Sequence, residues 1–308
     1  MEPGIHQVTN TGSKVRRLRL LGIPLVVMSA LFATGGGVIT AHASSPTYYL
    51  SLGDSLSQGV QPNDQGVSVE TNTGYANDLW HVEQLQIPHL QLAKLGCPGE
   101  TTTSMRTGVG SQCTYPDGSQ IAQAVDFIQH HKVAFITIDI GANDVDGCVV
   151  NGVIDLTCLF AGLAANFSDM TGSGLPTGQQ GILPSLTHAV VPPPPIFAMN
   201  YYDPFLAAWL TGTAGQAVAT QSVTLTTQFS AVEQNIYTAF GIPVADVTTA
   251  FQTTNFTNVP VVNLPVNVVT VCSLTFACTP PPVGPNVHPN EIGYGLIAAT
   301  FAQKIGTI

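Results

Sequence analysis

Charged residues are scarce in this chain, and positively charged ones most of all. Of its 308 residues only 8% are charged, with eight Lys and Arg against eighteen Asp and Glu and a formal net charge of −10. Roughly a quarter of the residues are charged in an average soluble domain. Because binding to phosphates requires clustered Lys and Arg, this composition argues against nucleic acid as a partner. The hydrophobic fraction of 44% is ordinary, so the chain can bury a core.

Half of the positive charges lie near the N-terminus, within residues 14–19. An apolar run at residues 20–40 follows directly and ends at Ala41-His42-Ala43. A basic segment, an apolar segment and a small-residue cleavage site are typical of a secretory signal peptide. We therefore expect residues 1–43 to be a signal peptide cleaved near Ala43, and the mature protein to be secreted. The pair Arg16-Arg17 is a poor match to a twin-arginine signal, which leaves the export route open.

The alternative interpretation of this segment is an uncleaved membrane anchor, since the apolar run is nearly long enough to span a bilayer. Gly22, Pro24 and the three glycines at 35–37 weaken that alternative. After cleavage, residues 44–308 would carry seventeen acidic and four basic side chains, a net charge of −13. We expect no stable membrane insertion of the mature chain, and little attraction to anionic membranes.

Cysteine occurs only six times, and no C-x-x-C pair or cysteine–histidine spacing fits a zinc site, so we expect no metal. An even number of cysteines in an exported protein indicates disulfides. Many connectivities are possible, and we favour sequential pairing because each pair would then bracket a short, turn-rich loop. The expected pairs are Cys97 with Cys113, Cys148 with Cys158, and Cys272 with Cys278.

Strand-like and helix-like segments alternate along the chain, which predicts an α/β layer fold with a mostly parallel sheet. With no internal repeat and no convincing linker, residues 44–308 are expected to form one domain. The expected strands are residues 48–52, 90–95, 133–140, 196–200 and 243–247. The expected helices are residues 75–85, 118–130, 182–190, 217–240 and 291–305. The segment 258–285 is expected to be a loop that contains a short hairpin.

Three short polar segments lie where these elements begin or end. Gly53-Asp54-Ser55-Leu56 follows the first strand, and Gly141-Ala142-Asn143-Asp144 follows the central strand. His288-Pro289-Asn290 lies just before the last helix. Ligands of open α/β sheets bind at the carboxyl ends of the strands, so the first two segments should share one edge. A serine, an asparagine and a histidine gathered there would form an acyl-transfer site.

GDSL at 53–56, GAND at 141–144 and HPN at 288–290, in this order and spacing, resemble the SGNH (GDSL-type) esterase and lipase family. Gly99 in CPGETT is similar to the family's glycine block, and the resemblance covers residues 48–305. It implies a three-layer α/β/α sandwich with a mostly parallel, flavodoxin-like five-stranded sheet. It also implies a serine esterase or lipase that hydrolyses carboxylic esters without a cofactor or metal. We expect a monomer.

The resemblance assigns roles to individual residues. Ser55 would be the nucleophile, and His288 the general base that a weakly nucleophilic hydroxyl needs. The oxyanion hole would consist of the backbone N–H groups of Ser55 and Gly99 and the side-chain amide of Asn143. Fixed donors of this kind stabilise charge that appears only in the tetrahedral intermediate.

One element departs from the family pattern. An Asp three residues before the histidine usually accepts the imidazole Nδ1–H, but Pro285 occupies that position here. We expect the Pro285 carbonyl to orient His288, with Asn286 as a weaker candidate and a folded-back Asp246 as a third. A neutral acceptor is sufficient to select the tautomer.

The resemblance allows lipids, phospholipids, short-chain esters and acetylated polysaccharides as substrates, without choosing among them. Loops 258–285 and 172–181 are expected to wall the acyl pocket. Phe205, Leu206 and Trp209 are expected to pack in the core, with a role in binding an apolar acyl chain as the alternative. A non-catalytic carbohydrate- or surface-binding protein on the same fold is the alternative function, and the missing Asp is its support.

Overall fold

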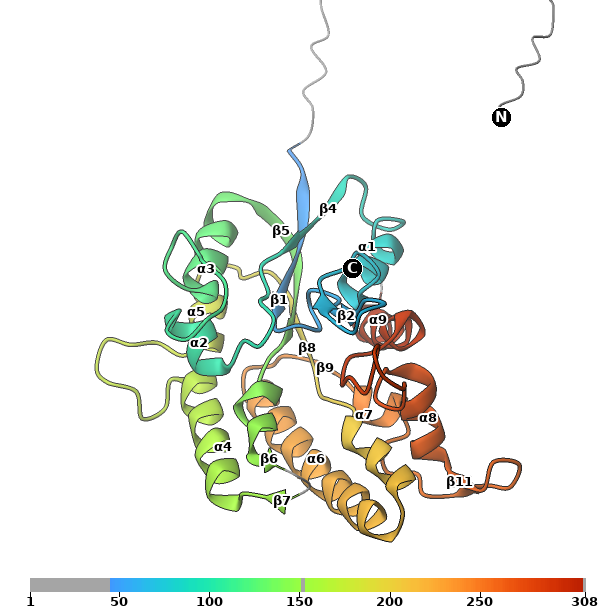
Figure 1. Ribbon diagram of the computed structural model, residues 1–308. Helices are drawn as coiled ribbons and strands as arrows, with labels where there is room; N and C mark the ends of the chain where they lie inside the picture. The colour runs from blue at the N-terminus through green and yellow to red at the C-terminus, as the bar shows by residue number, and fades with distance from the viewer. Residues whose placement is uncertain (1–44, 151–152, 307–308) are drawn as a thin grey trace, which may run out of the picture. The chain divides into compact units, whose positions relative to one another are not determined.

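A parallel sheet with strand order β4–β1–β5–β8–β9 forms the centre of the computed structural model (Figure 1). In chain order this is 2-1-3-4-5, the flavodoxin-like order, so the predicted fold class is confirmed. The structure describes residues 45–150 and 153–306. The strands of the sheet are β1 Thr47–Gly53, β4 Leu90–Lys94, β5 Lys132–Asp139, β8 Ile196–Met199 and β9 Val244–Ala245.

The two central strands are covered on both faces because both of their alternating sets of side chains are apolar. Tyr49 on β1 stacks on Phe135 of β5, with ring centroids 4.4 Å apart, on one face of the sheet. Leu50 and Leu52 point to the opposite face, because successive side chains of a strand alternate. A strand that is buried on both sides reads as a nearly continuous apolar run, which explains why these strands were recognisable in the sequence.

Helices cover the sheet on both sides, which makes three layers (Figure 1). One face packs against α1 and α9, whose core residues include Leu79 and Phe301. The other face packs against α3 and α5, through residues such as Ile128 and Leu186. The α-helices are α1 Tyr75–Glu83, α2 Thr102–Thr107, α3 Gln120–His130, α4 Leu156–Thr171, α5 Ile182–Thr187, α6 Thr213–Ala239, α7 Val247–Ala250, α8 Val266–Leu274 and α9 Glu291–Ile305. The 3₁₀ turns are η1 Ala142–Asp144, η2 Asp146–Cys148 and η3 Pro204–Thr211.

Three two-stranded ribbons and three disulfides complete the fold. The ribbons pair β2 Gln61–Pro62 with β3 Ser68–Val69, β6 Val149–Val150 with β7 Val153–Ile154, and β10 Asn258–Val259 with β11 Leu264–Pro265. The disulfides join Cys97 to Cys113, Cys148 to Cys158, and Cys272 to Cys278, which is the sequential pairing expected from the sequence.

Several segments differ from the sequence-based expectation, among them the short helices α2 and α7, the second of which begins inside the expected strand 243–247. The loop 258–285 contains the expected hairpin, β10–β11, but also the unpredicted helix α8. Four of the nine residues of α8 are valines, which have a low helix propensity. Val268 and Val271 are fully buried in the core, so tertiary packing decides the conformation of this segment. The helix α4 was also missed, and its N-terminus is capped by Asp155.

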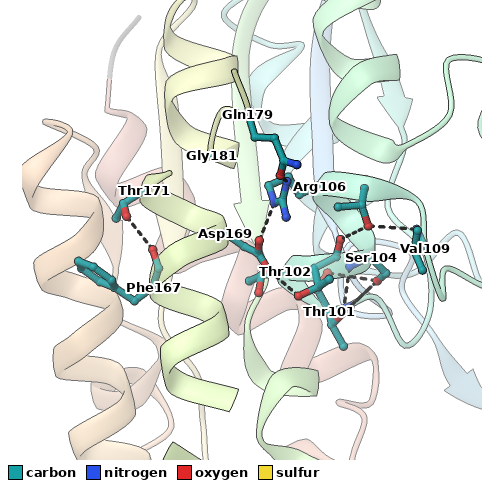
Figure 2. A network of polar contacts seen from close by, with 12 residues as sticks. Thr101, Thr102, Ser104, Arg106, Val109, Phe167, Asp169, Thr171, Gln179 and Gly181 are labelled. Carbon is teal, nitrogen blue, oxygen red and sulfur yellow. Dashed lines mark hydrogen bonds and ion pairs between the residues drawn. The ribbon is translucent and has the colours of Figure 1, made fainter. Parts of the chain in front are cut away.

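The short helix α2 is fastened to α4 by an ion pair. The Arg106 Nε lies 2.5 Å from Oδ1 of Asp169, and both side chains are largely buried. Figure 2 shows Arg106 between Asp169 and Gln179, whose Oε1 accepts a second hydrogen bond from Arg106 at 3.0 Å. Thr103 donates to the other oxygen of Asp169. Because α2 directly follows the segment that contains Gly99, this contact also holds that segment in place.

The described residues form one compact unit. The predicted signal peptide, residues 1–43, lies outside the residues that the structure describes. Among the helices of residues 45–150 and 153–306, none is long and apolar enough to cross a membrane.

Candidate active site

Ser55 lies in the turn that follows β1, at the carboxyl edge of the sheet. The turn requires Gly53, which has φ of +137° and whose Cβ, if present, would lie 2.1 Å from the Asp139 carbonyl oxygen. The side-chain amide of Gln120 forms two hydrogen bonds with the backbone of Gly53. Its oxygen accepts from the Gly53 N–H at 2.7 Å, and its NH₂ group donates to the Gly53 carbonyl at 3.0 Å. The strand end that presents Ser55 is therefore fixed from a neighbouring helix.

The imidazole of His288 meets the hydroxyl of Ser55, although 233 positions separate them in sequence. The distance from Nε2 to Oγ is 2.9 Å. Two backbone contacts hold this segment: the Phe276 N–H donates to the His288 carbonyl at 3.0 Å, and the Tyr202 hydroxyl donates to the Val287 carbonyl at 2.7 Å. The first and third of the predicted polar segments are thus brought into hydrogen-bonding contact.

Asn286 orients the imidazole. Its Oδ1 lies 2.6 Å from His288 Nδ1 and also accepts from the His288 backbone N–H at 3.0 Å. The Asn286 Nδ2 donates to the Ser68 Oγ at 3.0 Å, which fits this orientation of the amide. Because Oδ1 is only an acceptor, the proton must reside on Nδ1, and Nε2 is left free to accept from Ser55.

The preference for the Pro285 carbonyl as the partner of His288 is therefore wrong. Asn286 is only two residues before the histidine. Its side-chain oxygen therefore reaches both the backbone N–H and the ring Nδ1 of His288. Asp246 does not reach the site, because its carboxylate caps α7 through Thr249 and accepts from Asn200 at 2.9 Å.

Burial lowers the pKa of the His288 imidazole to about 4. The charged form of a buried group loses hydration, and a neutral amide, unlike a carboxylate, gives little Coulombic compensation. The imidazole is consequently neutral, and able to accept a proton, over the whole range above pH of about 4.

The predicted oxyanion-hole residues lie close to Ser55. Gly99 has φ of +76°, and a Cβ there would approach the Gln112 side chain to 2.8 Å, so the position favours glycine. Among the described residues, no acceptor is bound to the backbone N–H groups of Ser55 and Gly99. The Asn143 Nδ2 donates to the Glu100 carbonyl at 2.9 Å and, over a longer distance of 3.3 Å, to Asp54 Oδ2.

Two buried carboxyl groups lie beneath this turn. The Asp54 N–H donates to the Asp139 carbonyl at 3.1 Å, and both side chains are almost fully buried. Burial raises the pKa of both carboxyls, and the charge of Asp54 raises the pKa of Asp139 further. The Tyr75 hydroxyl donates to Asp139, and the Leu56 N–H donates to Asp54 at 2.9 Å. Asp54 thereby links the turn of Ser55 to the amide of Asn143.

A cleft of about 490 Å³ opens over these groups. Of the predicted site residues, Ser55, Gly99, Asn143 and His288 all line it. Three of its other lining residues are acidic, namely Asp54, Glu70 and Asp146, and none of the described lining residues is Lys or Arg. The cleft therefore offers an anionic group no charged partner among its described lining residues.

Other predictions about the cleft are not met, and some contributors were not anticipated. Neither of the loops 172–181 and 258–285 lines it. Gln120, Tyr202 and Ser68 support the site, although none of them was assigned a role there from the sequence. Within the described part of the chain, no group of His, Cys, Asp or Glu side chains could hold a metal ion.

The chain is similar to known ester hydrolases. A family model described as GDSL-like lipase/acylhydrolase matches residues 49–301. No curated protein matches. A structure described as a GDSL-like lipase from Parabacteroides merdae is 14% identical with a TM-score of 0.54, covering 86% of this chain and 97% of that one. An acetylxylan esterase from Geobacillus stearothermophilus is 18% identical with a TM-score of 0.47, covering 85% and 95%. An extracellular lipase from Streptomyces rimosus is 15% identical with a TM-score of 0.49, covering 84% and 99%.

Proposed function

Since the chain belongs to the GDSL-like lipase/acylhydrolase family of ester hydrolases, we propose that it hydrolyses carboxylic esters through an acyl-enzyme on Ser55. The contact of 2.9 Å between Ser55 Oγ and His288 Nε2 carries this proposal. A serine hydroxyl becomes an effective nucleophile when a base lies within hydrogen-bonding distance. Asn286 supports the same role, because it keeps the proton of the neutral imidazole on Nδ1.

In the first half of the reaction, the Ser55 Oγ attacks the ester carbonyl carbon and its proton passes to His288 Nε2. The tetrahedral intermediate then collapses, and His288 returns this proton to the departing alkoxide, so that the alcohol leaves. In the second half, water attacks the acyl-enzyme, again with His288 as the base. Proton transfer back to Ser55 releases the carboxylic acid and restores the enzyme.

The negative charge of the intermediate would be stabilised by the N–H groups of Ser55 and Gly99 and by the Asn143 amide. The Asn143 Nδ2 has only two hydrogens, and both are donated within the protein. We therefore propose that the longer of these bonds, to Asp54, is exchanged for the substrate oxygen. The bond of 2.9 Å to the Glu100 carbonyl would keep the amide in place.

The test uses purified protein and p-nitrophenyl acetate. We expect the Ser55→Ala variant to lose at least about 10³-fold in kcat, because the nucleophile is removed. Ser273→Ala is the matched control, since this exposed hydroxyl bonds only within its own helix, and it should retain the wild-type rate. Turnover that survives Ser55→Ala, in a protein with an unchanged thermal melt, would refute the proposal.

The non-catalytic alternative rested on the absence of the usual Asp. Asn286 supplies an acceptor for the histidine, so the absence of the Asp does not leave the imidazole without a partner. No second function is therefore proposed.

We also propose that the enzyme is secreted after cleavage near Ala43 and acts as a monomer. Three disulfides among the described residues support an oxidising compartment. N-terminal sequencing of the protein recovered from the medium tests the cleavage site, and an uncleaved chain in the membrane fraction would contradict it. Light scattering of the purified enzyme tests its oligomeric state.

A further inference from the structure

A second, narrow pocket of about 70 Å³ lies beside the catalytic cleft. Its walls come from α4, α6 and the turns η2 and η3, and Figure 1 shows α4 and α6 extending together beyond the carboxyl ends of the strands. Most of its lining is apolar, with Val145, Leu159, Phe205, Leu225 and Phe229 as the main contributors.

This pocket adjoins the catalytic cleft. Asp146 lines both spaces. The boundary also falls between adjacent residues on η3, because Pro204 lines the cleft and the next residue, Phe205, lines the pocket. The catalytic cleft and the pocket are therefore adjacent along η2 and η3.

Three of the lining residues of the pocket are polar, Asp146, Ser222 and Thr226, and the other seven are apolar. The Ser222 hydroxyl donates to Asp203 Oδ2 at 2.7 Å, so it is already satisfied. Asp146 lies at the junction with the cleft, and burial of its carboxyl raises its pKa to about 7, so this group is largely neutral in mildly acidic solution. The interior is thus a place where apolar groups gain by leaving water.

We propose that this pocket binds the acyl chain of the ester and selects short to medium straight chains over acetyl groups. This proposal rests on the proposed esterase function. A pocket of about 70 Å³ is larger than a single water requires, so it has room for a short stretch of methylene groups beyond those in the cleft. An acetyl group would end in the cleft without reaching the pocket, whereas a butyryl or hexanoyl chain would enter it. The preferred substrates are therefore neutral esters of such acids.

The experiment compares kcat/KM for p-nitrophenyl acetate, butyrate and hexanoate. Each methylene that enters the pocket should raise kcat/KM by about fourfold, so hexanoate should exceed acetate by at least about tenfold. In Leu225→Trp the indole fills the pocket, and the hexanoate-to-acetate ratio should fall toward one. Gln228→Trp is the matched control on the exposed side of α6, and it should keep the wild-type ratio.

The outcomes separate this proposal from the esterase proposal. Acetate turnover that depends on Ser55, combined with equal kcat/KM for acetate and hexanoate in the wild-type protein, would overturn the acyl pocket alone. A ratio unchanged by Leu225→Trp would also overturn it. Absence of Ser55-dependent turnover of every ester would overturn the esterase proposal instead. If Leu225→Trp fails to fold, Val218→Phe narrows the same pocket from α6, and the wild-type ratio remains decisive.

Discussion

At the scale of single residues, the partner of the histidine distinguishes this site. Asn286 accepts from the same imidazole nitrogen that a carboxylate would contact, at 2.6 Å, but it contributes no negative charge. An amide can select the tautomer, while only a carboxylate also stabilises the imidazolium. The pKa of His288 is accordingly lowered to about 4 by burial. The base should therefore work in mildly acidic surroundings, where an ordinary histidine is protonated.

This reasoning predicts the effect of Asn286→Asp on the pH profile. A carboxylate beside Nδ1 favours the charged imidazole, so it should raise the pKa of His288 by roughly 1–3 units. Only the neutral imidazole acts as the base, so the acid limb of kcat/KM should move upward in pH from its wild-type position near 4. A pH–rate profile with p-nitrophenyl acetate from about pH 3.5 to 8 measures it.

Asn286→Ala serves as the companion variant. It removes the acceptor without adding charge, so the rate should fall on the order of 100-fold through loss of the tautomer preference. Superimposable pH profiles for the wild type and Asn286→Asp, or full activity of Asn286→Ala, would contradict an orienting role for Asn286.

At the scale of elements, the position of Gly99 depends on how α2 is held. The segment that contains Gly99 is anchored on both sides, by the disulfide of Cys97 and by the ion pair from α2 to α4 (Figure 2). Arg106 is one of four basic residues after residue 43, and it is placed in a largely buried pair. Breaking such a pair from one side leaves an uncompensated charge, which is strongly destabilising.

We therefore predict that Arg106→Met lowers the free energy of unfolding by about 3 kcal/mol, since Asp169 loses its partner. In a domain of this size the melting temperature should fall by roughly 6–12 °C. Differential scanning calorimetry measures the change in melting temperature. Lys132→Met is the control, because it also removes one positive charge but at an exposed position, and it should change the melting temperature less.

Adding Asp169→Asn to Arg106→Met should recover part of the lost stability, because the double variant has no unpaired charge. Equal melting temperatures for Arg106→Met and Lys132→Met would show that the pair contributes nothing.

At the scale of the whole molecule, the few acidic groups include several that are buried with raised pKa values. Burial raises the pKa of Glu233 to about 8 and that of Asp203 to about 6. It also raises the pKa of the paired Asp54 and Asp139. In the unfolded chain these carboxyls titrate near pH of about 4. Between the unfolded pKa of about 4 and the raised pKa of each carboxyl in the folded protein, the folded protein holds more protons than the unfolded one. The free energy of unfolding therefore falls as pH rises through this range.

The protein should consequently melt several degrees higher near pH 5 than near pH 8. His288 acts in the opposite sense, because its folded pKa of about 4 makes stability fall as pH decreases below the unfolded value of about 6.5. It is a single group against several carboxyls, so the carboxyls should decide the sign. Calorimetric scans across this range measure the trend.

Glu233→Gln provides the specific test. Glutamine can still accept the hydrogen bond of 2.8 Å that Asn166 donates, but it cannot ionise, so the difference in melting temperature between the two pH values should shrink. The exposed Asp64→Asn should leave that difference unchanged. A protein that melts higher near pH 8 than near pH 5 would contradict the assignment of buried, protonated carboxyls.

Much of this molecule was predictable because its signals are local. Five apolar strand segments and the order of three polar motifs are visible directly in the sequence. The segments that were missed, such as α8, have valines that disfavour a helix and become helical only against a core. The expected partner of His288 was also wrong, because whether a side chain or a backbone carbonyl reaches Nδ1 depends on a turn that no residue pattern specifies.

By itself, the sequence determined the α/β architecture, the scarcity of charge and the residues available for chemistry, since these follow from composition and local periodicity. Only the tertiary structure decided which of those residues meet. It brings His288 to 2.9 Å from Ser55 across the length of the chain, and it places Phe205 and Leu225 around one apolar pocket. Such contacts arise when the packing of helices on the sheet closes long loops, and that packing minimises exposed apolar surface over the whole domain. The same scarcity of charge leaves the cleft without a cation among its described lining residues, as suits a neutral ester.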